Sequence, residues 1–480
     1  MRIRMVIFLL GVLQIFVGLS MIFPFLCALY YGDGDAQGIF VSMCITVGIG
    51  GILAGLFHDK QELRAREGFM IVTGGWVGMS LFGTLPYLLT GASNSFVDAL
   101  FETISGFTTT GATIFPNVEI LPHGVLFWRS ETHWIGGMGI IVLSLAVLPF
   151  LGVGGMQLFK AEVPGHTIDK LSPRIGQTAK LLWGVYILFS AVQVILLKIG
   201  GMSFFDACCH MFGSMGTGGF STKNLSVGAY NSPYIEYVMI IFMFLAGANF
   251  SLHYRALWGG ISCYRKDWEF LLYCIIIVTA TIFISLQIGG VNYSSVEPTI
   301  RSALFQVVSI CTTTGFGTAD YCKWSFASQF VIFLLMFIGG CTGSTGGSIK
   351  VMRIGILLKN SIIEIKRLVH PNAVIPVKMR DTTISPEIIY NIMGFFLLYL
   401  GVYIIGVLVL ALSGVDLLTA FGASSACLGN IGPGLGQVGP ASTYANIPII
   451  GKIVLSISML LGRLELYTVL VIFSKSFWKV

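Results

Sequence analysis

Apolar runs long enough to cross a lipid bilayer follow one another along almost the whole chain. A membrane-spanning helix needs about 20 mainly apolar residues. Only 10% of the residues are charged, against roughly 25% in soluble domains, so most of the chain cannot face water. We therefore predict an all-α polytopic membrane protein with ten spans, at about 5–30, 37–57, 69–90, 125–150, 179–200, 234–257, 269–289, 327–358, 387–413 and 447–474.

The distribution of Lys and Arg predicts the orientation, because these residues collect in the cytoplasmic loops of membrane proteins. With the N-terminus inside, 21 of the 28 Lys and Arg residues fall in inner segments or at the inner ends of spans, six fall in outer segments or at the outer ends of spans, and Arg463 remains alone inside a span. Both termini are therefore predicted to be cytoplasmic, in a multi-pass protein of the cell inner (plasma) membrane. The net charge of +6 then reflects topology and contact with anionic membrane lipid, and no basic-aromatic face indicates nucleic-acid binding.

Four short glycine-bearing segments recur between the apolar runs, each after a weakly helical stretch, and in each an alanine precedes one glycine by twelve residues. They are 108–112, 217–221, 312–316 and 429–434. A twelve-residue helix reaches only about 18 Å, so each stretch enters the membrane halfway and returns as non-helical backbone. Such backbone cannot face lipid, because its unpaired polar groups are too costly there. The four segments are therefore predicted to line a water-filled path.

The repeated order of span, short helix, glycine loop and span divides the chain after its first two spans. The predicted units are an N-terminal helical pair and four pore repeats, at 1–68, 69–178, 179–268, 269–386 and 387–480. A repeated module of this kind is common in membrane transport proteins.

The glycine loops have the chemistry of a cation filter. Glycine allows a positive φ, so consecutive carbonyl oxygens can point to one axis and replace the hydration shell of a monovalent cation. The C-terminal ends of the short helices also favour a cation. Tight helix packing is the alternative for any one loop, but four copies at one spacing favour a pore. In the second loop Gly218 and Gly219 are adjacent, which leaves the register open by one residue. The predicted filter residues are Thr109, Thr110, Gly111, Gly218, Gly219, Phe220, Thr313, Thr314, Gly315, Asn430, Ile431 and Gly432.

The eighth span is interrupted by the segment 339–348, which has five glycines in ten residues. Because each glycine costs a helix about 1 kcal/mol, the span is predicted to break into two arms around a movable obstruction beneath the pore. Arg463 belongs with it, since a charge at bilayer depth faces a cavity or a partner. It either repels cations or binds carbonyls of the loop; the simpler alternative is a local pair with Glu465. The predicted gate residues are Gly339, Gly340, Thr342, Gly343, Ser344, Thr345, Gly346, Gly347, Lys350 and Arg463.

The glycine loops and several further segments together resemble the Trk/Ktr/HKT potassium transporter family, most closely its TrkH branch. The further segments are 134–140, 151–157, 339–347, 368–373 and 462–465. The resemblance extends over essentially the whole chain. It implies a pseudo-fourfold pore that takes up potassium through Gly111, Gly219, Gly315 and Gly432. Relatives with serine at the first of these positions favour sodium, so Gly111 supports potassium.

The resemblance also implies partners and a gate. Family members form homodimers and bind a cytosolic TrkA-like ring whose nucleotide sites regulate opening, with the loop 339–348 and Arg463 as the inner gate. The basic inner segment 350–380 offers that ring a docking surface, although lipid contact explains it equally simply. The third loop departs from the family in carrying Gly317, where other members often have a hydroxyl residue.

Two other functions were weighed against potassium uptake. A membrane-embedded enzyme needs a nucleophile with a base, paired carboxylates or a metal cluster, and the sequence has no such pattern. A cation/proton-coupled carrier needs acidic residues within its spans, and the predicted spans contain few. No bound cofactor is expected, and potassium is the substrate.

Overall fold

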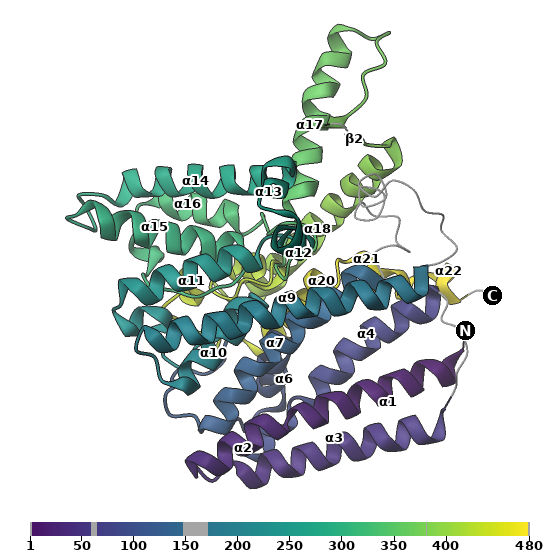
Figure 1. Cartoon of the computed structure of the whole chain (residues 1–480), viewed down its shortest axis with the longest axis vertical. Helices are drawn as coiled ribbons and strands as arrows, with labels where there is room; N and C mark the ends of the chain where they lie inside the picture. Colours follow the sequence, from purple (N-terminus) through teal and green to yellow (C-terminus); the bar gives the residue numbers. More distant parts are fainter. Residues whose placement is uncertain (1, 59–64, 147–170, 381, 479–480) are drawn as a thin grey trace.

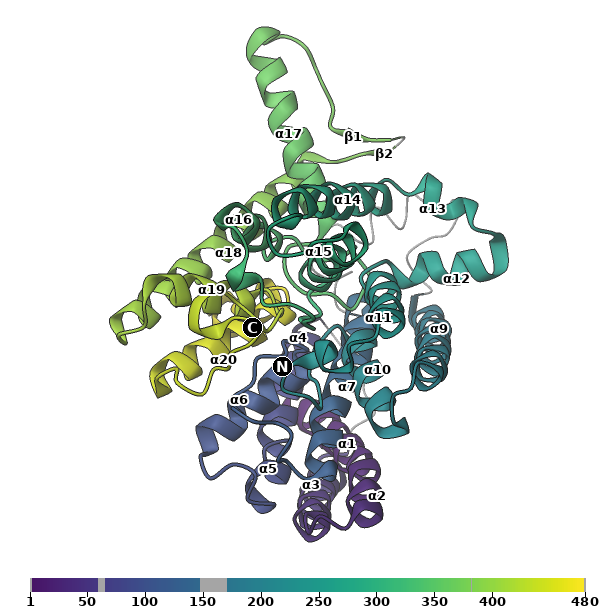
Figure 2. The ribbon, with the colours of Figure 1, turned by 90° about the vertical axis from the view of Figure 1, so that its left-hand side faces the viewer.

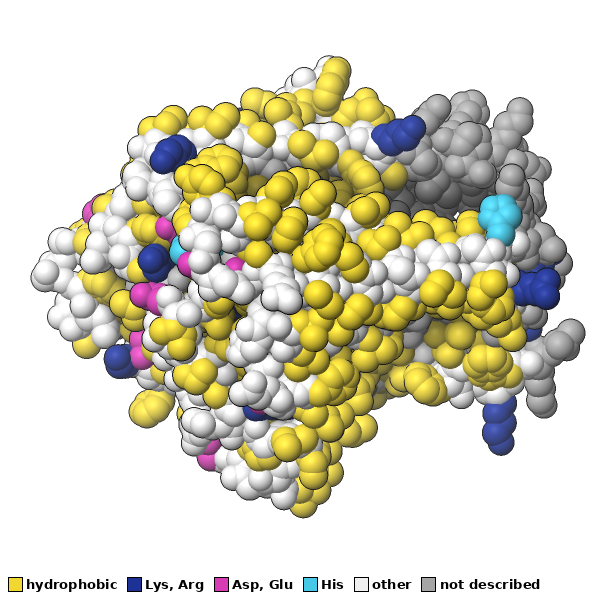
Figure 3. Space-filling model, turned by 90° about the horizontal axis from the view of Figure 1, so that it is seen from below, with side chains coloured by type: hydrophobic (Ala, Val, Ile, Leu, Met, Phe, Trp, Pro, Cys, Tyr) yellow, Lys and Arg dark blue, Asp and Glu magenta, His cyan; other side chains and the backbone are white. Residues whose placement is uncertain are grey.

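The computed structural model describes residues 2–58, 65–146, 171–380 and 382–478, and its regular structure is almost entirely helical. The predicted motif at 151–157 lies outside these residues. The first helices form an N-terminal unit of two spans, made of α1 (Ile3–Ser20), α2 (Ile22–Tyr31) and α3 (Ala36–Leu56). Glycines bring α1 and α3 into backbone contact, since a Cβ on Gly11 would lie 2.8 Å from the carbonyl oxygen of Gly50. Hydrophobic side chains cover the face of the molecule on this side (Figure 3), as contact with lipid tails requires.

Four short helices follow at intervals, each placed between the helices of predicted spans. They are α6 (Phe96–Phe107), α10 (Phe204–Gly216), α15 (Val296–Cys311) and α19 (Leu417–Leu428). With 12 to 16 residues each, they reach about 18 to 24 Å at 1.5 Å per residue, which is too short for a bilayer. Figure 2 places the four helices and their neighbours around a common centre. The predicted all-α membrane fold is thus confirmed, and the arrangement is consistent with four repeats in a pseudo-fourfold plan.

Further helices flank each short helix, and most of them lie within predicted spans. The first unit has α4 (Ala65–Phe82), α5 (Leu85–Leu89) and α7 (His123–Ala146); the others have α9 (Leu171–Ile199), α11 (Pro233–Ala246), α12 (Phe250–Gly259), α14 (Trp268–Ile288), α16 (Phe326–Leu335), α18 (Pro386–Leu412), α20 (Ile449–Arg463) and α21 (Tyr467–Leu470). Among the described residues, six helices are long and apolar enough to cross a membrane, or up to eight if each bent pair counts as one span. Short elements connect them: α13 (Ser262–Lys266), α22 (Lys475–Trp478) and the 3-10 turns η3 (Ser226–Tyr230), η4 (Tyr321–Lys323), η5 (Gly436–Val438) and η6 (Val471–Phe473).

Two predicted spans are not straight, so the prediction of ten spans with a break only in the eighth is wrong at 234–257 and 447–474. The helices α11 and α12 meet at 100°, and α20 and the segment Tyr467–Phe473 meet at 106°. The first bend occurs where Asn249 leaves the helix and its side chain accepts a hydrogen bond from the Ser251 N–H (2.8 Å), which caps α12. The second occurs where Glu465 and Leu466 take left-handed conformations (φ 57° and 49°), which no α-helix accommodates.

The predicted break in the eighth span is confirmed. Helix α16 ends at Leu335, and α17 (Val351–Val369) begins only after the glycine-rich segment. A hydrogen bond from the Gly339 N–H to the Ile349 carbonyl (2.8 Å) closes the segment into a loop. Beyond it, α17 leaves the body of the molecule, and the short antiparallel strands β1 (Lys378–Met379) and β2 (Thr382–Thr383) follow (Figures 1 and 2).

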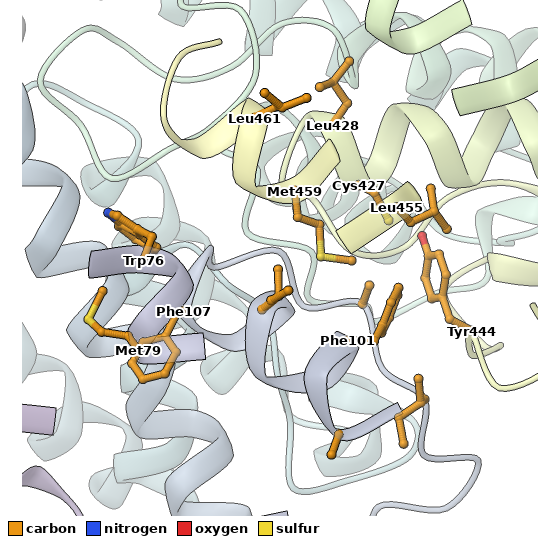
Figure 4. Packing of buried hydrophobic residues seen from close by; sticks show 14 of the residues in the cluster. Trp76, Met79, Phe101, Phe107, Cys427, Leu428, Tyr444, Leu455, Met459 and Leu461 are labelled. Atoms are coloured by element: carbon orange, nitrogen blue, oxygen red, sulfur yellow. The ribbon is translucent and has the colours of Figure 1, made fainter. Parts of the chain in front are cut away.

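Buried side chains join the first and last units, which closes the circle of short helices. Phe101 on α6 lies 5.5 Å from Tyr444 between ring centroids, and Leu455 and Met459 of α20 are fully buried in the same cluster. Figure 4 shows these residues between α6, α19 and α20. This packing connects the first unit to the last, because residues more than 300 positions apart in the sequence share one buried cluster.

Candidate ion pore

The four glycine loops share one backbone conformation. In each loop a residue with positive φ stands two positions before a glycine with positive φ. The pairs are Thr109 (53°) and Gly111 (80°), Thr217 (56°) and Gly219 (76°), Thr313 (60°) and Gly315 (85°), and Asn430 (55°) and Gly432 (92°). The repeated pattern also settles the structural register of the second loop, because Gly219 occupies the position of the other three glycines and Gly218 does not have a positive φ.

The loops meet as a closed ring in which each glycine faces a backbone carbonyl of the next loop. A Cβ on Gly111 would lie 2.0 Å from the Gly218 oxygen, and one on Gly219 would lie 2.2 Å from the Thr314 oxygen. In the same way, a Cβ on Gly315 would lie 2.0 Å from the Ile431 oxygen, and one on Gly432 would lie 2.6 Å from the Thr110 oxygen. A side chain at any of these approaches would displace the facing carbonyl. Glycine is therefore required here for both its positive φ and its missing Cβ.

On one side of the ring lies a cavity of about 180 Å³ that all four glycines line: Gly111, Gly219, Gly315 and Gly432. Most of its other lining residues follow the glycines in sequence, within 112–118, 220–226 and 433–444, and Gly317 and Arg129 complete the lining. The cavity thus opens at the ring itself.

Threonine and asparagine side chains tie the residues just before the glycines to one another. Thr108 and Thr110 share a hydroxyl contact of 2.8 Å, and Thr312 and Thr314 share one of 2.7 Å. Asn430 donates to the Thr110 hydroxyl (3.0 Å) and so links the fourth loop to the first. Thr109, Thr110, Thr313 and Thr314 are fully buried, so the ring is held by protein rather than by solvent.

Phe220, a predicted filter residue, packs behind the ring. The centroid of the Phe220 aromatic ring lies 4.2 Å from that of the His133 imidazole, and the Phe220 N–H donates to His133 Nε2 (3.2 Å). The guanidinium carbon of Arg129 lies 3.6 Å from the centroid of the Phe220 aromatic ring. Phe220 therefore supports the second loop through its side chain, while only its backbone belongs to the ring.

Sequence reasoning missed a buried charge network that supports the loops. Arg129 is 2% exposed and Glu102 is fully buried. The two form an ion pair with 2.6 Å between Arg129 Nε and Glu102 Oε1. Glu102 also accepts from the Ile114 N–H (2.8 Å), and Arg129 donates to the Ser221 carbonyl (3.0 Å). The pair thus joins the loops after Gly111 and Gly219. Arg129 was predicted to lie in an outer segment; its place inside a long apolar run, close to His133, was the available signal.

The segment 339–348 lies on the opposite side of the ring from the cavity. Its Gly347 N–H donates to Thr313 Oγ1 (2.6 Å), and its Thr345 carbonyl accepts from Thr217 Oγ1 (2.8 Å). A Cβ on Gly347 would lie 2.5 Å from the Gly429 oxygen. Three of the four loops are therefore in direct contact with this segment, on the side of the ring away from the cavity.

The remaining predicted gate residues gather around the same segment. Arg463 is 2% exposed, donates to the Thr345 carbonyl (2.6 Å) and reaches the Gly136 carbonyl (3.3 Å). Lys350 donates to the Gly346 carbonyl. Glu465 pairs with Arg353, so the predicted alternative of a local pair between Arg463 and Glu465 is wrong. Two functional roles were predicted for Arg463, to repel cations or to bind carbonyls of the loop. The structure shows the second contact, with the Thr345 carbonyl.

The bend between α11 and α12 also holds the segment. The Gly247 carbonyl accepts from the Cys341 N–H (2.8 Å), and the Phe250 N–H donates to the Gly343 carbonyl (3.1 Å). A Cβ on Gly340 would lie 2.5 Å from the Gly247 oxygen. Both broken helices therefore satisfy part of their exposed backbone on each other, which explains how non-helical backbone is accommodated within the membrane protein.

Comparison with known proteins identifies the family. Residues 35–267 and 268–479 match the TrkH family, whose members are described as cation transport proteins. The chain belongs to the TrkH family. The Trk system potassium uptake protein TrkH of Halomonas elongata is 40% identical over 490 residues, and that of Escherichia coli K12 is 41% identical over 484 residues, each with 100% of both chains covered. The TrkG protein of the same E. coli strain is 36% identical over 487 residues, covering 100% of this chain and 99% of TrkG.

A solved structure shares the fold. The crystal structure of the potassium transporter TrkH from Vibrio parahaemolyticus covers 100% of both chains with a TM-score of 0.92 at 37% identity. The TrkH family is a family of transporters, so the enzyme alternative is excluded. Together with the apolar helices, membership makes this chain a multi-pass inner membrane protein.

Proposed function

We propose that this chain takes up potassium across the inner membrane through the ring of glycine loops, which acts as its selectivity filter. The observation that supports this best is the closed ring itself, where each of Gly111, Gly219, Gly315 and Gly432 abuts a carbonyl of the next loop. Carbonyl rings replace the hydration shell of a monovalent cation. Relatives covering the whole chain carry the name potassium uptake protein.

The loop 339–348 is proposed as the gate. It touches the inner sides of three of the filter loops, and the buried Arg463 binds its Thr345 carbonyl. A buried cation on the inner side of the filter disfavours potassium there. Movement of the loop and of Arg463 away from the axis would open the path. The glycines supply the backbone freedom that such a movement needs.

The assembly is proposed to be a homodimer with both termini in the cytoplasm, regulated by a cytosolic TrkA-like nucleotide-binding ring. The projecting α17 and the hairpin that follows carry basic residues (Lys359, Lys366, Arg367 and Lys378). They are the proposed docking surface for that ring, and membrane lipid is the competing occupant.

The test is growth of a potassium-uptake-deficient bacterium on low-potassium medium, with the chain expressed alone or together with a TrkA-like protein. The expected result is growth that is stronger when the regulator is present. The control is the same host with the empty vector, and immunodetection verifies that the chain is in the membrane. Failure to grow in both cases, with the protein present in the membrane, would overturn the proposed function.

A further inference from the structure

A buried carboxylate outside the predicted gate binds the gate loop at two places. Glu269 stands near the start of α14 and is 7% exposed. Its Oε1 atom accepts hydrogen bonds from the Thr342 N–H (2.6 Å), from Thr342 Oγ1 (3.1 Å) and from the Met352 N–H (3.1 Å). A single carboxyl oxygen thus accepts three hydrogen bonds, and a buried polar group depends on such partners.

The three donors lie on both sides of the flexible part of the loop. Thr342 is near its beginning, and Met352 is in the first turn of α17, just after its end. The first N–H groups of a helix lack partners inside the helix and attract negative charge. Lys350, the residue that precedes α17, makes no side-chain cap. Glu269 therefore caps α17 from another helix while it holds the start of the loop.

The position from which Glu269 acts is rigid. Asp267 caps α14 by accepting from the Phe270 N–H (2.8 Å). Helix α17 approaches α14 so closely that a Cβ on Gly355 would lie 2.8 Å from the Trp268 ring and 2.9 Å from the Leu272 side chain. The junction of α14 and α17 is thus fixed by packing, and the glycine-rich segment between Thr342 and Lys350 is the part that can move.

Other groups also hold the loop, but they have a different chemistry. Its bonding partners on neighbouring elements include the backbone carbonyls of Ala246 and Gly247, the Phe250 N–H, the hydroxyls of Thr217 and Thr313, and Arg463. Within the described residues, Glu269 is the carboxylate to which hydrogen bonds from this loop reach. A single side chain thus connects the loop to the fixed α14–α17 junction.

We propose that Glu269 is a positioning residue that keeps the loop 339–348 in its closed place beneath the ring. The inference rests on the proposed function, because it takes this loop to be the gate. Loss of the carboxylate frees Thr342 and the start of α17 together. The loop then leaves the inner side of the ring more often, while the ring itself is unchanged.

The experiment uses Cys341 as a reporter, because this native loop residue is 1% exposed and adjoins Thr342. In the full chain with the nine other cysteines replaced by alanine, Glu269→Ala is compared with the parent protein. Labelling of Cys341 by a charged methanethiosulfonate is expected to accelerate about tenfold or more, since the loop loses its hydrogen bonds to the Glu269 carboxyl group. Potassium flux into liposomes without a regulator is expected to rise in parallel, with unchanged preference for potassium over sodium.

Two further variants guard against a folding defect. Glu364→Ala is the matched control, because Glu364 lies on the exposed part of α17 and, among the described residues, pairs with Arg367; it should change neither readout. Thr342→Val removes the hydroxyl bond alone and should shift labelling in the same direction by a smaller factor. Parent-like labelling of Cys341 in both Glu269→Ala and Thr342→Val would overturn the inference. Fast labelling without any rise in flux would support Glu269 as the holder of the loop and count against the loop as the gate.

Discussion

Single residues in this protein decide what the ring can tolerate. At Gly111 the backbone φ of 80° and the 2.0 Å approach of the Gly218 oxygen leave no place for a side chain. Gly218 is excluded from substitution for another reason, since a Cβ there would lie 2.3 Å from the His133 ring. Two adjacent glycines, Gly218 and Gly219, are thus required by two different contacts, one behind the ring and one within it.

Replacing Gly111 by serine is expected to increase sodium entry relative to potassium. The added Cβ displaces the Gly218 carbonyl, so one side of the ring no longer matches the potassium shell. The measurement is the ratio of sodium to potassium flux in liposomes. Gly317→Ser is the control, because it adds the same side chain to the same cavity where a Cβ meets only the Pro440 side chain, at 3.6 Å. Equal selectivity in the two variants would contradict the filter assignment.

The buried pair of Arg129 and Glu102 gives a prediction about stability. Arg129→Gln leaves Glu102 buried without its partner, which is expected to cost about 3–5 kcal/mol. Glu102→Gln should be similarly destabilising, and the double variant should recover part of the loss because neither charge remains. Thermal unfolding of the purified protein in detergent measures all three. A double variant as unstable as the sum of the singles would show that the pair is not coupled.

At the scale of elements, broken helices determine how this protein is built. Three predicted spans are interrupted, at 247–249, 336–350 and 464–466. Polar groups at these breaks form hydrogen bonds with one another. Gly247 and Arg463 both bind the loop 339–348. The elements that would move in gating are therefore those with the fewest intrahelical bonds, as expected for the less stable parts of a fold.

Shortening the gate loop is expected to raise flux in the absence of a regulator. Deletion of Gly343 and Ser344 removes the bond from the Phe250 N–H to the Gly343 carbonyl, and the shortened segment cannot span the inner side of all three filter loops. Potassium flux into liposomes is the readout, and thermal stability verifies that the variant is folded. A folded variant that conducts less than the parent would contradict the gate proposal.

At the scale of the whole molecule, the arrangement of charge and apolar surface determines orientation. Hydrophobic side chains cover the lateral face, and the charged side chains in that view lie mostly toward its two ends (Figure 3). The N- and C-termini lie at the same end of the molecule (Figure 1). This agrees with the even number of membrane crossings that the sequence predicts, while the side on which the termini lie is the part to be tested.

Reporter fusions test that side. Alkaline phosphatase, which is active only outside the cytoplasm, is expected to be active when fused after Val291 and inactive when fused after Val374. Both residues are well exposed, at 83% and 97%, so the fusions leave the core intact. Fluorescent protein fused to the C-terminus is expected to fluoresce. Phosphatase activity in the opposite pattern would show that the termini lie outside the cytoplasm, contrary to the prediction.

The sequence by itself determined the features that depend on local rules. Hydropathy and length identified the membrane class, the twelve-residue spacing located α6 and α10, and the five glycines after Ile338 predicted the break in the eighth span. The bends at Asn249 and Glu465 were not predicted, because no run of helix-breaking residues marks them. Hydrogen bonds to the distant loop 339–348 and the pair of Glu465 with Arg353 hold the bent backbone.

Only the tertiary structure decided which residues meet. The register of Gly219, the closure of the ring from Gly432 to Thr110, and the buried partners Glu102 and Glu269 follow from contacts between segments far apart in the chain. Hydrophobic periodicity is read within one helix, whereas a carbonyl ring and a buried carboxylate are placed by the packing of several helices. The sequence thus specified the parts of the pore, and packing specified how they face one another.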